Sequence, residues 1–140
     1  MREILFRGKW RYNGEWVEGH YVKALDMYGR EIHVIFESTA TFYSDGETSG
    51  FILVNPETIC QYTGLIDKNG KKIWEGDICD RKEQYPEIVK YRDGDWTLDY
   101  SYVSHKESGV CYCNLGFYAE ERKCVEVIGN IFDNPELLEA

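Results

Sequence analysis

Tight-turn signals recur along this chain and divide it into short segments, which constrains the fold more than any other feature of the sequence. Asn13 with Gly14, and Asp93 with Gly94, are residue pairs that tolerate the positive φ of two-residue hairpin turns. Longer turn segments, which share glycine and short polar residues, lie at 26–30, 44–47 and 67–71. No segment shows sustained helical spacing of apolar residues. The sequence therefore predicts antiparallel hairpins.

Strands are expected on both sides of these turns. The expected strands cover 4–12, 15–25, 32–37, 39–43, 50–54, 77–81, 87–92, 95–103, 110–118 and 123–132. Asn55, Pro56 and Glu57 are the residue types of a helix start. Residues that favour strands follow them, so a short helix and a strand both remain open for 55–64. The same triplet at Asn134 predicts one terminal helical turn.

The second half of the chain has the rhythm of a small SH3-like or Tudor-like β-barrel. Residues 74–78 resemble its entry strand, 88–98 its central hairpin and 125–131 its closing strand. The fold class is therefore expected to be mainly β, α+β at most, with few short helices. We expect an N-terminal antiparallel β subdomain at 1–55 and the barrel subdomain at 56–140, within one compact domain.

The charge of the chain is acidic and unevenly distributed. The net charge is −9 over 140 residues, yet the first twelve residues are basic, with Arg2, Arg7, Lys9 and Arg11 against Glu3. An acidic body argues against direct nucleic-acid binding and against anionic membranes, and it fits a basic protein partner. The alternative for the basic start is an edge strand kept soluble by its charge.

Cysteine usage indicates a reducing compartment. The five cysteines have irregular spacing, which does not indicate a disulfide framework. No apolar run is long enough for a membrane span, and the apolar stretch near the N-terminus is too short for a signal peptide. We therefore expect a cytoplasmic protein with reduced thiols.

Catalytic and metal-binding patterns are weak. Cys111, Cys113 and His105 are the best candidate metal ligands, with Cys60, Cys79 or Cys124 as a fourth, but reduced and partly buried thiols explain them more simply. His20 and His33 have no nucleophile motif beside them. We predict no metal, no cofactor and no enzymatic activity.

Aromatic residues with acidic neighbours form the best candidate partner-binding site. Such residues hold cationic groups by cation–π attraction and ion pairing. The candidate residues are Tyr91, Trp96, Tyr100, Asp93 and Asp95. The alternative is that Trp96 belongs to the hydrophobic core.

Three blocks of sequence carry a family resemblance. The first runs through 2–9 and 13–19, the second through 56–78, and the third through 125–131 and 134–138. With these blocks in this order, the chain resembles the YopX family of phages, prophages and mobile elements of Gram-positive bacteria. The resemblance implies a mainly β fold around a small barrel, with self-association. It supplies no catalytic residues, and 26–52 and 100–122 depart most from the family pattern.

These observations predict a function of protein contact. The leading hypothesis is a non-enzymatic accessory protein of a phage or prophage that binds a host or phage protein in the cytoplasm. The first alternative is an acidic DNA mimic that inhibits a nucleic-acid-binding enzyme. The second is a protein or enzyme that binds a small ligand.

Overall fold

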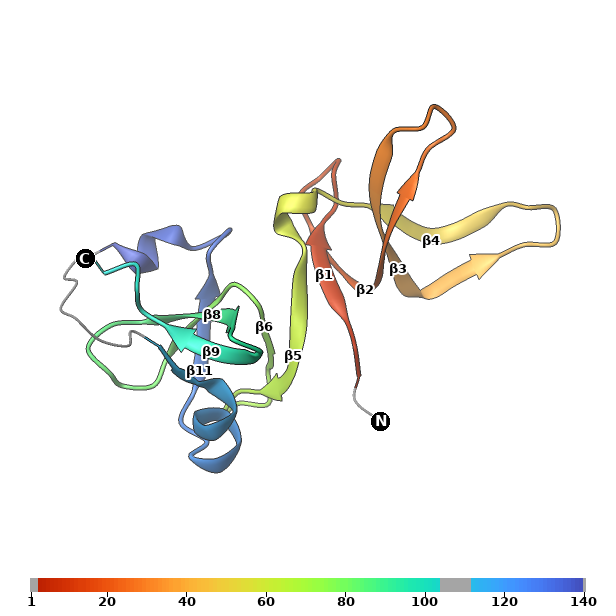
Figure 1. Ribbon diagram of the computed structural model, residues 1–140. Coiled ribbons are helices and arrows are strands. Elements are labelled where there is room, and N and C mark those ends of the chain that lie inside the picture. The colour runs from red at the N-terminus through yellow and green to blue at the C-terminus, as the bar shows by residue number, and fades with distance from the viewer. Residues whose placement is uncertain (1–2, 104–111, 140) are drawn as a thin grey trace. The chain divides into compact units, whose positions relative to one another are not determined.

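The fold was analysed in a computed structural model that describes residues 3–103 and 112–139 (Figure 1). In these residues the strands form two antiparallel sheets, which confirms the mainly β prediction. The chain divides into two compact units, an N-terminal unit of residues 1–61 and a C-terminal unit of residues 62–140. In the described segments no helix is long and apolar enough to span a membrane.

Two long hairpins dominate the N-terminal unit. Its strands are β1 (Phe6–Lys9), β2 (Trp16–Leu25), β3 (Glu31–Phe42), β4 (Thr48–Leu53) and the first residues of β5 (Cys60–Ile66). They lie in the order β4-β3-β2-β1-β5, so β1 lies between β2 and β5. The basic residues of this strand are therefore not on a sheet edge, and the edge-strand interpretation of the basic start is wrong. Instead, Arg7 and Lys9 lie 4.5 and 5.3 Å from the ring centroid of Trp16.

Local turn chemistry explains these hairpins. Asp26 closes the β2–β3 turn, because its carboxylate accepts the backbone amides of Tyr28 and Arg30, each at 2.9 Å. Gly29 adopts a φ of 78°, which glycine adopts at little cost. The β1–β2 turn is longer than the predicted two residues, because the amide of Trp10 bonds the carbonyl of Glu15 at 2.8 Å.

The core of the N-terminal unit is built where β2 and β3 approach closely. Val34, Ile35 and Val54 are buried. A Cβ atom on Gly19 would lie 2.7 Å from the carbonyl carbon of Phe36, and closer still to its oxygen. Only glycine fits at this crossing.

The C-terminal unit contains an open sheet of five strands: β7 (Asp77–Asp80), β8 (Glu87–Arg92), β9 (Asp95–Asp99), β10 (Tyr112–Asn114) and β11 (Glu126–Asn130). It also contains the end of β5 and β6 (Lys72–Trp74), which belong to the six-stranded sheet. The five-stranded sheet has the order β10-β9-β8-β7-β11. Three helical turns complete the described chain: Pro56–Thr58 in the N-terminal unit, and Phe117–Glu121 and Pro135–Leu138 in this unit. A helical turn after Asn55 and another after Asn134 are thus present.

The expected closed barrel is not found in the described part of the chain. β10 and β11 are the two edges of the sheet and do not pair with each other. The physical reason lies after β10, where the expected strand at 110–118 gives way to a helical turn. Asn114 starts this turn by accepting the amide of Phe117 at 2.7 Å. Leu115 and Ala119 then pack on the sheet and cover its core.

The hydrophobic core of the C-terminal unit lies between this helical turn and the sheet. Its buried members are Ile73, Cys79, Val89, Leu98, Leu115, Ala119 and Val125. Trp96 and Val127 are partly buried against the same cluster. One face of β7, β8 and β9 therefore packs in this hydrophobic core.

Candidate functional site

A polar hollow of about 190 Å³ lies beside the loop between β7 and β8 in the C-terminal unit. It is lined by Arg81, Glu83, Gln84, Tyr85, Glu87 and Tyr100. The loop supplies four of these residues, Glu87 is the first residue of β8, and Tyr100 directly follows β9. The hollow therefore combines carboxylates, a guanidinium and two phenol rings.

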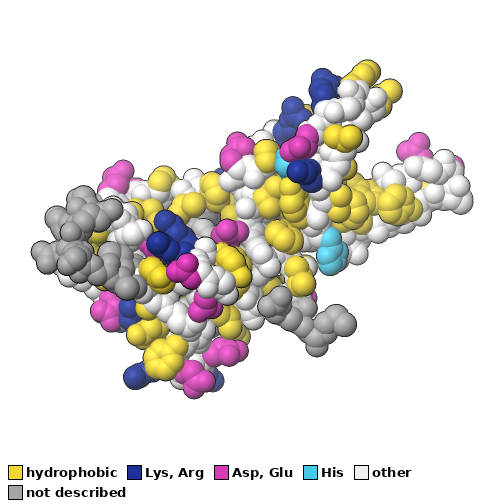
Figure 2. Space-filling model, in the orientation of Figure 1, with side chains coloured by type: hydrophobic (Ala, Val, Ile, Leu, Met, Phe, Trp, Pro, Cys, Tyr) yellow, Lys and Arg dark blue, Asp and Glu magenta, His cyan; other side chains and the backbone are white. Residues whose placement is uncertain are grey.

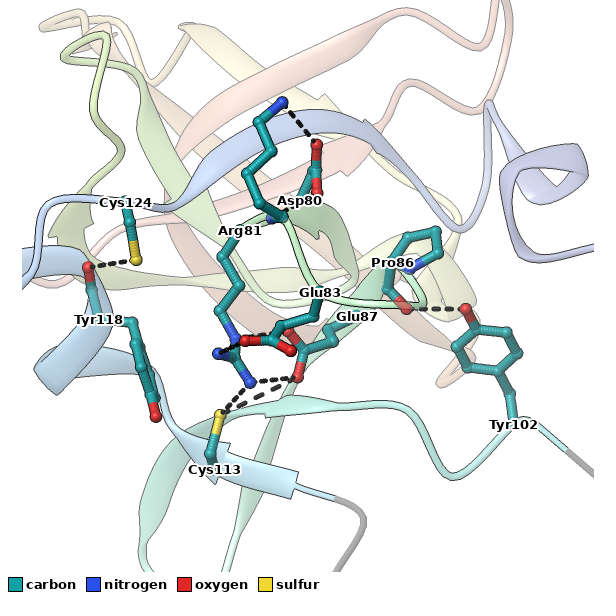
Figure 3. A network of polar contacts seen from close by, with 10 residues as sticks. Asp80, Arg81, Glu83, Pro86, Glu87, Tyr102, Cys113, Tyr118 and Cys124 are labelled. Carbon is teal, nitrogen blue, oxygen red and sulfur yellow. Dashed lines mark hydrogen bonds and ion pairs between the residues drawn. The ribbon is translucent and has the colours of Figure 1, made fainter. Parts of the chain in front are cut away.

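An ion pair between Arg81 and Glu87 lies at this hollow (Figure 3). Nε and Nη2 of Arg81 donate to the two oxygens of Glu87 at 2.7 and 3.4 Å. Nη1 donates to Glu83 at 3.0 Å. The Glu87 side chain is only 2% exposed, so this pairing compensates a buried carboxylate.

Two further side chains fix the position of Arg81. Its guanidinium carbon lies 4.2 Å from the ring centroid of Tyr118, and Nη2 lies 3.5 Å from Sγ of Cys113. Burial raises the pKa of Glu87, and the bonds from Arg81 only partly oppose that rise. Burial disfavours the charge of Arg81, but the bonds to Glu87 outweigh it and raise the pKa of Arg81. The arrangement has the character of a rigid structural pair.

The weak candidate metal ligands do not form a site in the described residues. Cys113 lies beside Arg81, whereas Cys111 and His105 fall outside the described residues. Within residues 3–103 and 112–139, no group of three or more His, Cys, Asp or Glu side chains could hold a metal ion. Burial raises the pKa of the Cys79 and Cys113 thiols, so both stay protonated near neutral pH.

Four of the predicted partner-binding residues lie in the β8–β9 hairpin, and the fifth, Tyr100, directly follows β9. Tyr91 and Trp96 form a cross-strand ring pair with centroids 5.0 Å apart. Asp93 and Asp95 hold the edge strand β10, because they accept bonds from the side chains of Tyr112 and Asn114 respectively. Tyr100 lines the polar hollow instead. The structure therefore places four of the five residues in one hairpin, with both carboxylates bonded to β10, and Tyr100 beyond the other end of β9.

The buried carboxylate of Asp99, at the end of β9, also has hydrogen-bond partners. Asp99 is fully buried and accepts bonds from Arg92 and from the amide and hydroxyl of Ser101, the latter two at 2.8 and 2.6 Å. Burial raises the pKa of Asp99, but the Ser101 and Arg92 bonds outweigh it, and the net effect is a lowered pKa. This pair anchors the chain as it leaves β9.

Exposed apolar side chains cluster at the ends of the two long hairpins of the N-terminal unit, which extend as separate arms in Figure 1. We call these residues the hairpin ends: Leu25, Met27 and Tyr28 at the β2–β3 turn, and Phe42 and Tyr43 at the β3–β4 turn. Figure 2 shows hydrophobic side chains along both arms. The sequence reasoning missed this surface, although apolar residues beside predicted turns were a usable signal.

A hydrogen-bonded row in the N-terminal unit was also missed. The hydroxyl of Tyr21 lies 2.7 Å from Nδ1 of His33, and Nε2 of His33 lies 3.2 Å from Glu31. His33 and Glu31 border a second hollow of about 270 Å³. Both ring nitrogens are held by neighbours, so the imidazole has one fixed orientation.

Residues of the second and third family-like blocks stabilise the C-terminal unit. Asp67, in the β5–β6 turn, accepts the amides of Asn69 and Lys71 at 2.8 and 2.9 Å and that of Val127 at 2.9 Å. A Cβ atom on Gly129 would lie 2.6 Å from Oδ1 of Asn134. The second block thus bonds the third.

The fold and its polar sites define a two-sheet antiparallel β protein whose motif residues build turns and strand contacts. The chain belongs to the YopX family, because the model of the family described as YopX protein matches residues 5–139.

Two solved structures resemble this one over nearly their full lengths. Protein EF1440 from Enterococcus faecalis is 27% identical, with a TM-score of 0.58, covering 99% of this chain and 100% of its own. Protein yopX from Bacillus subtilis is 18% identical, with a TM-score of 0.53, covering 100% of this chain and 98% of its own. The second likeness shows the fold alone. No curated protein matches the chain.

Proposed function

We propose that this protein is a non-enzymatic interaction module that binds another protein through its hairpin ends. In this proposal it is an accessory protein of a phage or prophage and acts in the cytoplasm of a Gram-positive bacterium. The family and the two bacterial sources of the similar structures support that setting. The proposal does not require a barrel in the C-terminal unit.

The exposure of the hairpin ends carries the proposal. Met27 is 87% exposed and Phe42 is 75% exposed. Both lie at turns, where a charged or small residue would not lower the folding stability. Aromatic residues and methionine are enriched in protein–protein interfaces, where their burial supplies binding energy. Two exposed apolar turns on one unit, one at each end of β3, therefore fit a protein partner, or a second copy of the chain.

The acidic DNA mimic is less well supported. A mimic needs exposed carboxylates at phosphate-like spacing, but several carboxylates of this chain are buried and bonded. The buried acidic residues include Asp67, Asp77, Glu87 and Asp99. These four of the 25 acidic residues therefore serve folding rather than a nucleic-acid-like surface.

Affinity purification from bacterial lysate, with and without nuclease, tests the proposal. The test variant combines Met27→Ser, Tyr28→Ser and Phe42→Ser, and the matched control is Ile66→Ser, an exposed apolar residue of the C-terminal unit. We expect one partner that survives nuclease, that is lost with the triple variant and that is retained by the control. Recovery of nucleic-acid enzymes alone would favour the mimic. Light scattering of the purified protein then separates a foreign partner from self-association.

A further inference from the structure

We propose that the polar hollow of the C-terminal unit is a receptor for a basic side chain, an arginine or lysine, presented by a protein partner. The inference rests on the proposed protein-contact function but uses residues distant in sequence from the hairpin ends. The residues that carry it are Tyr85, Tyr100 and Glu83, over the Arg81–Glu87 pair.

The charge of the hollow favours a cation. Arg81 directs three N–H groups at the carboxylates of Glu83 and Glu87, so its positive charge is matched by two negative charges. The Glu83 side chain is 58% exposed and keeps acceptor capacity toward solvent. The nearby Lys82 ammonium is paired with Asp80 at 3.4 Å. One net negative charge therefore remains for a cation to pair with.

The walls of the hollow suit the same ligand. Tyr85 and Tyr100 are half-buried and both line the hollow. A guanidinium or ammonium gains from an aromatic face and from a nearby carboxylate at the same time, and the gain grows where water is partly excluded. A volume of about 190 Å³ admits one side chain rather than a large ligand. The net charge of −9 would also speed the approach of a basic partner.

An anionic ligand fits less well. It would have to displace Glu83 from Nη1 of Arg81 and would then face the buried carboxylate of Glu87. Arg81 is also held from the side by the Tyr118 ring, which leaves it no freedom to follow a new partner. The Arg81–Glu87 pair is therefore the floor of the site rather than its binding group.

The test titrates isotope-labelled protein with a hexaarginine peptide and follows backbone amide signals by NMR. The neutral control is the matching hexacitrulline peptide, which has the same shape without the charge. We expect saturable shifts at Tyr85, Tyr100 and Glu83 with the arginine peptide and none with the citrulline peptide. Shifts spread evenly over exposed acidic residues would overturn the proposal, because they would indicate attraction by net charge alone.

Variants distinguish binding at the hollow from general attraction by the net charge of the protein. Glu83→Gln should raise the Kd about fivefold, whereas Glu47→Gln, which removes the same charge from an exposed turn of the N-terminal unit, should change it less than about twofold. Tyr100→Leu should raise the Kd about threefold or more and Tyr100→Phe should restore it, since the ring rather than the hydroxyl acts. Equal losses in Glu83→Gln and Glu47→Gln would refute the site.

The hairpin-end variant distinguishes this site from the proposed function. Met27→Ser, Tyr28→Ser and Phe42→Ser together should leave the affinity for hexaarginine unchanged while abolishing partner capture. If that variant keeps its partner and Glu83→Gln still weakens peptide binding, the hairpin-end proposal fails and the hollow stands. If the peptide produces no localised shifts in the wild type, the hollow fails independently of the partner.

Discussion

The carboxylate of Asp67 accepts the backbone amide of Val127 at 2.9 Å, although the two residues are 60 positions apart. The same carboxylate holds the β5–β6 turn closed, so one side chain stabilises a local turn and attaches strand β11 to it. The amide of Lys68 adds a bond to the carbonyl of Val125 at 2.8 Å. Together with the pairing of β11 with β7, this junction links the middle and the end of the C-terminal unit.

Replacing Asp67 should therefore destabilise the C-terminal unit strongly. Asp67→Ala leaves three backbone amides without their acceptor, and we expect a loss of about 2–4 kcal/mol in the free energy of unfolding. Urea unfolding measures it. The control is Asp45→Ala, which removes a single bond to the amide of Glu47 in an exposed turn and should cost under about 1 kcal/mol. Equal losses in both variants would contradict the role of the junction.

A methyl group at Gly19 should disrupt the N-terminal unit. Gly19→Ala would place Cβ against the carbonyl of Phe36, which is backbone and cannot rotate away, so we expect a loss of about 3 kcal/mol or more. Amide exchange measured by NMR should show the loss in β2 and β3. Gly116→Ala is the matched control, because its φ of −59° suits alanine and its nearest neighbour is an ordinary 3.4 Å away.

The contact between Gly129 and Asn134 can be tested with a double-mutant cycle. Gly129→Ala should destabilise the protein by about 1–3 kcal/mol, because the new methyl group collides with the Asn134 side chain. Asn134→Ala loses the bond that its Oδ1 accepts from the backbone amide of Asn130 at 3.2 Å. The double variant should be more stable than the sum of the single losses predicts. Additive losses would show that the clash is relieved elsewhere.

Breaking the Arg81–Glu87 pair should destabilise the fold strongly, whereas replacing both residues with apolar ones should destabilise it little. Arg81→Met leaves the buried carboxylate of Glu87 unpaired, and we expect a loss of about 3 kcal/mol in thermal or urea unfolding. The double variant Arg81→Met with Glu87→Leu should recover most of that loss. A double variant as unstable as the single one would mean that the pair contributes more than mutual compensation.

Acid sensitivity should depend on Asp99. Its folded-state pKa is lowered below the ordinary value of 3.8, so its contribution to stability is present above that pH and is lost as the pH falls through the lower, folded value. The stability gap between wild type and Asp99→Asn should therefore narrow as the pH falls below about 4 in urea titrations. Ser101→Ala, which removes the hydroxyl donor, should move this narrowing to higher pH. A gap independent of pH would contradict the assignment.

Predictions from the sequence were most successful where the physics is local. The turn at Asp93 and Gly94 was expected from two adjacent residues, and both adopt positive φ, of 52° and 83°. The helical turn after Asn134 likewise follows from its Pro135. The β1–β2 turn is longer than the predicted two residues, because its residues fit turns of several lengths.

The errors concern positions that other parts of the chain decide. The barrel prediction failed because the helical turn at Phe117–Glu121 covers the sheet, and the chain near Asn114 gave no periodic signal of it. The contacts of Asp93 and Asp95 were likewise decided elsewhere in the chain, because β10 pairs with β9 and its Tyr112 and Asn114 side chains bond the two carboxylates. Neighbours in sequence were thus divided among different contacts.

The sequence by itself determined the strand-and-turn pattern, the mainly β class and the family, because φ preferences and side-chain alternation act over a few residues. Tertiary structure alone decided which carboxylates are buried, that Gly19 meets Phe36, that apolar side chains are exposed at the hairpin ends, and that Arg81 borders a hollow. These depend on pairings across tens of residues, whose register is set by packing of the whole sheet and by no local preference.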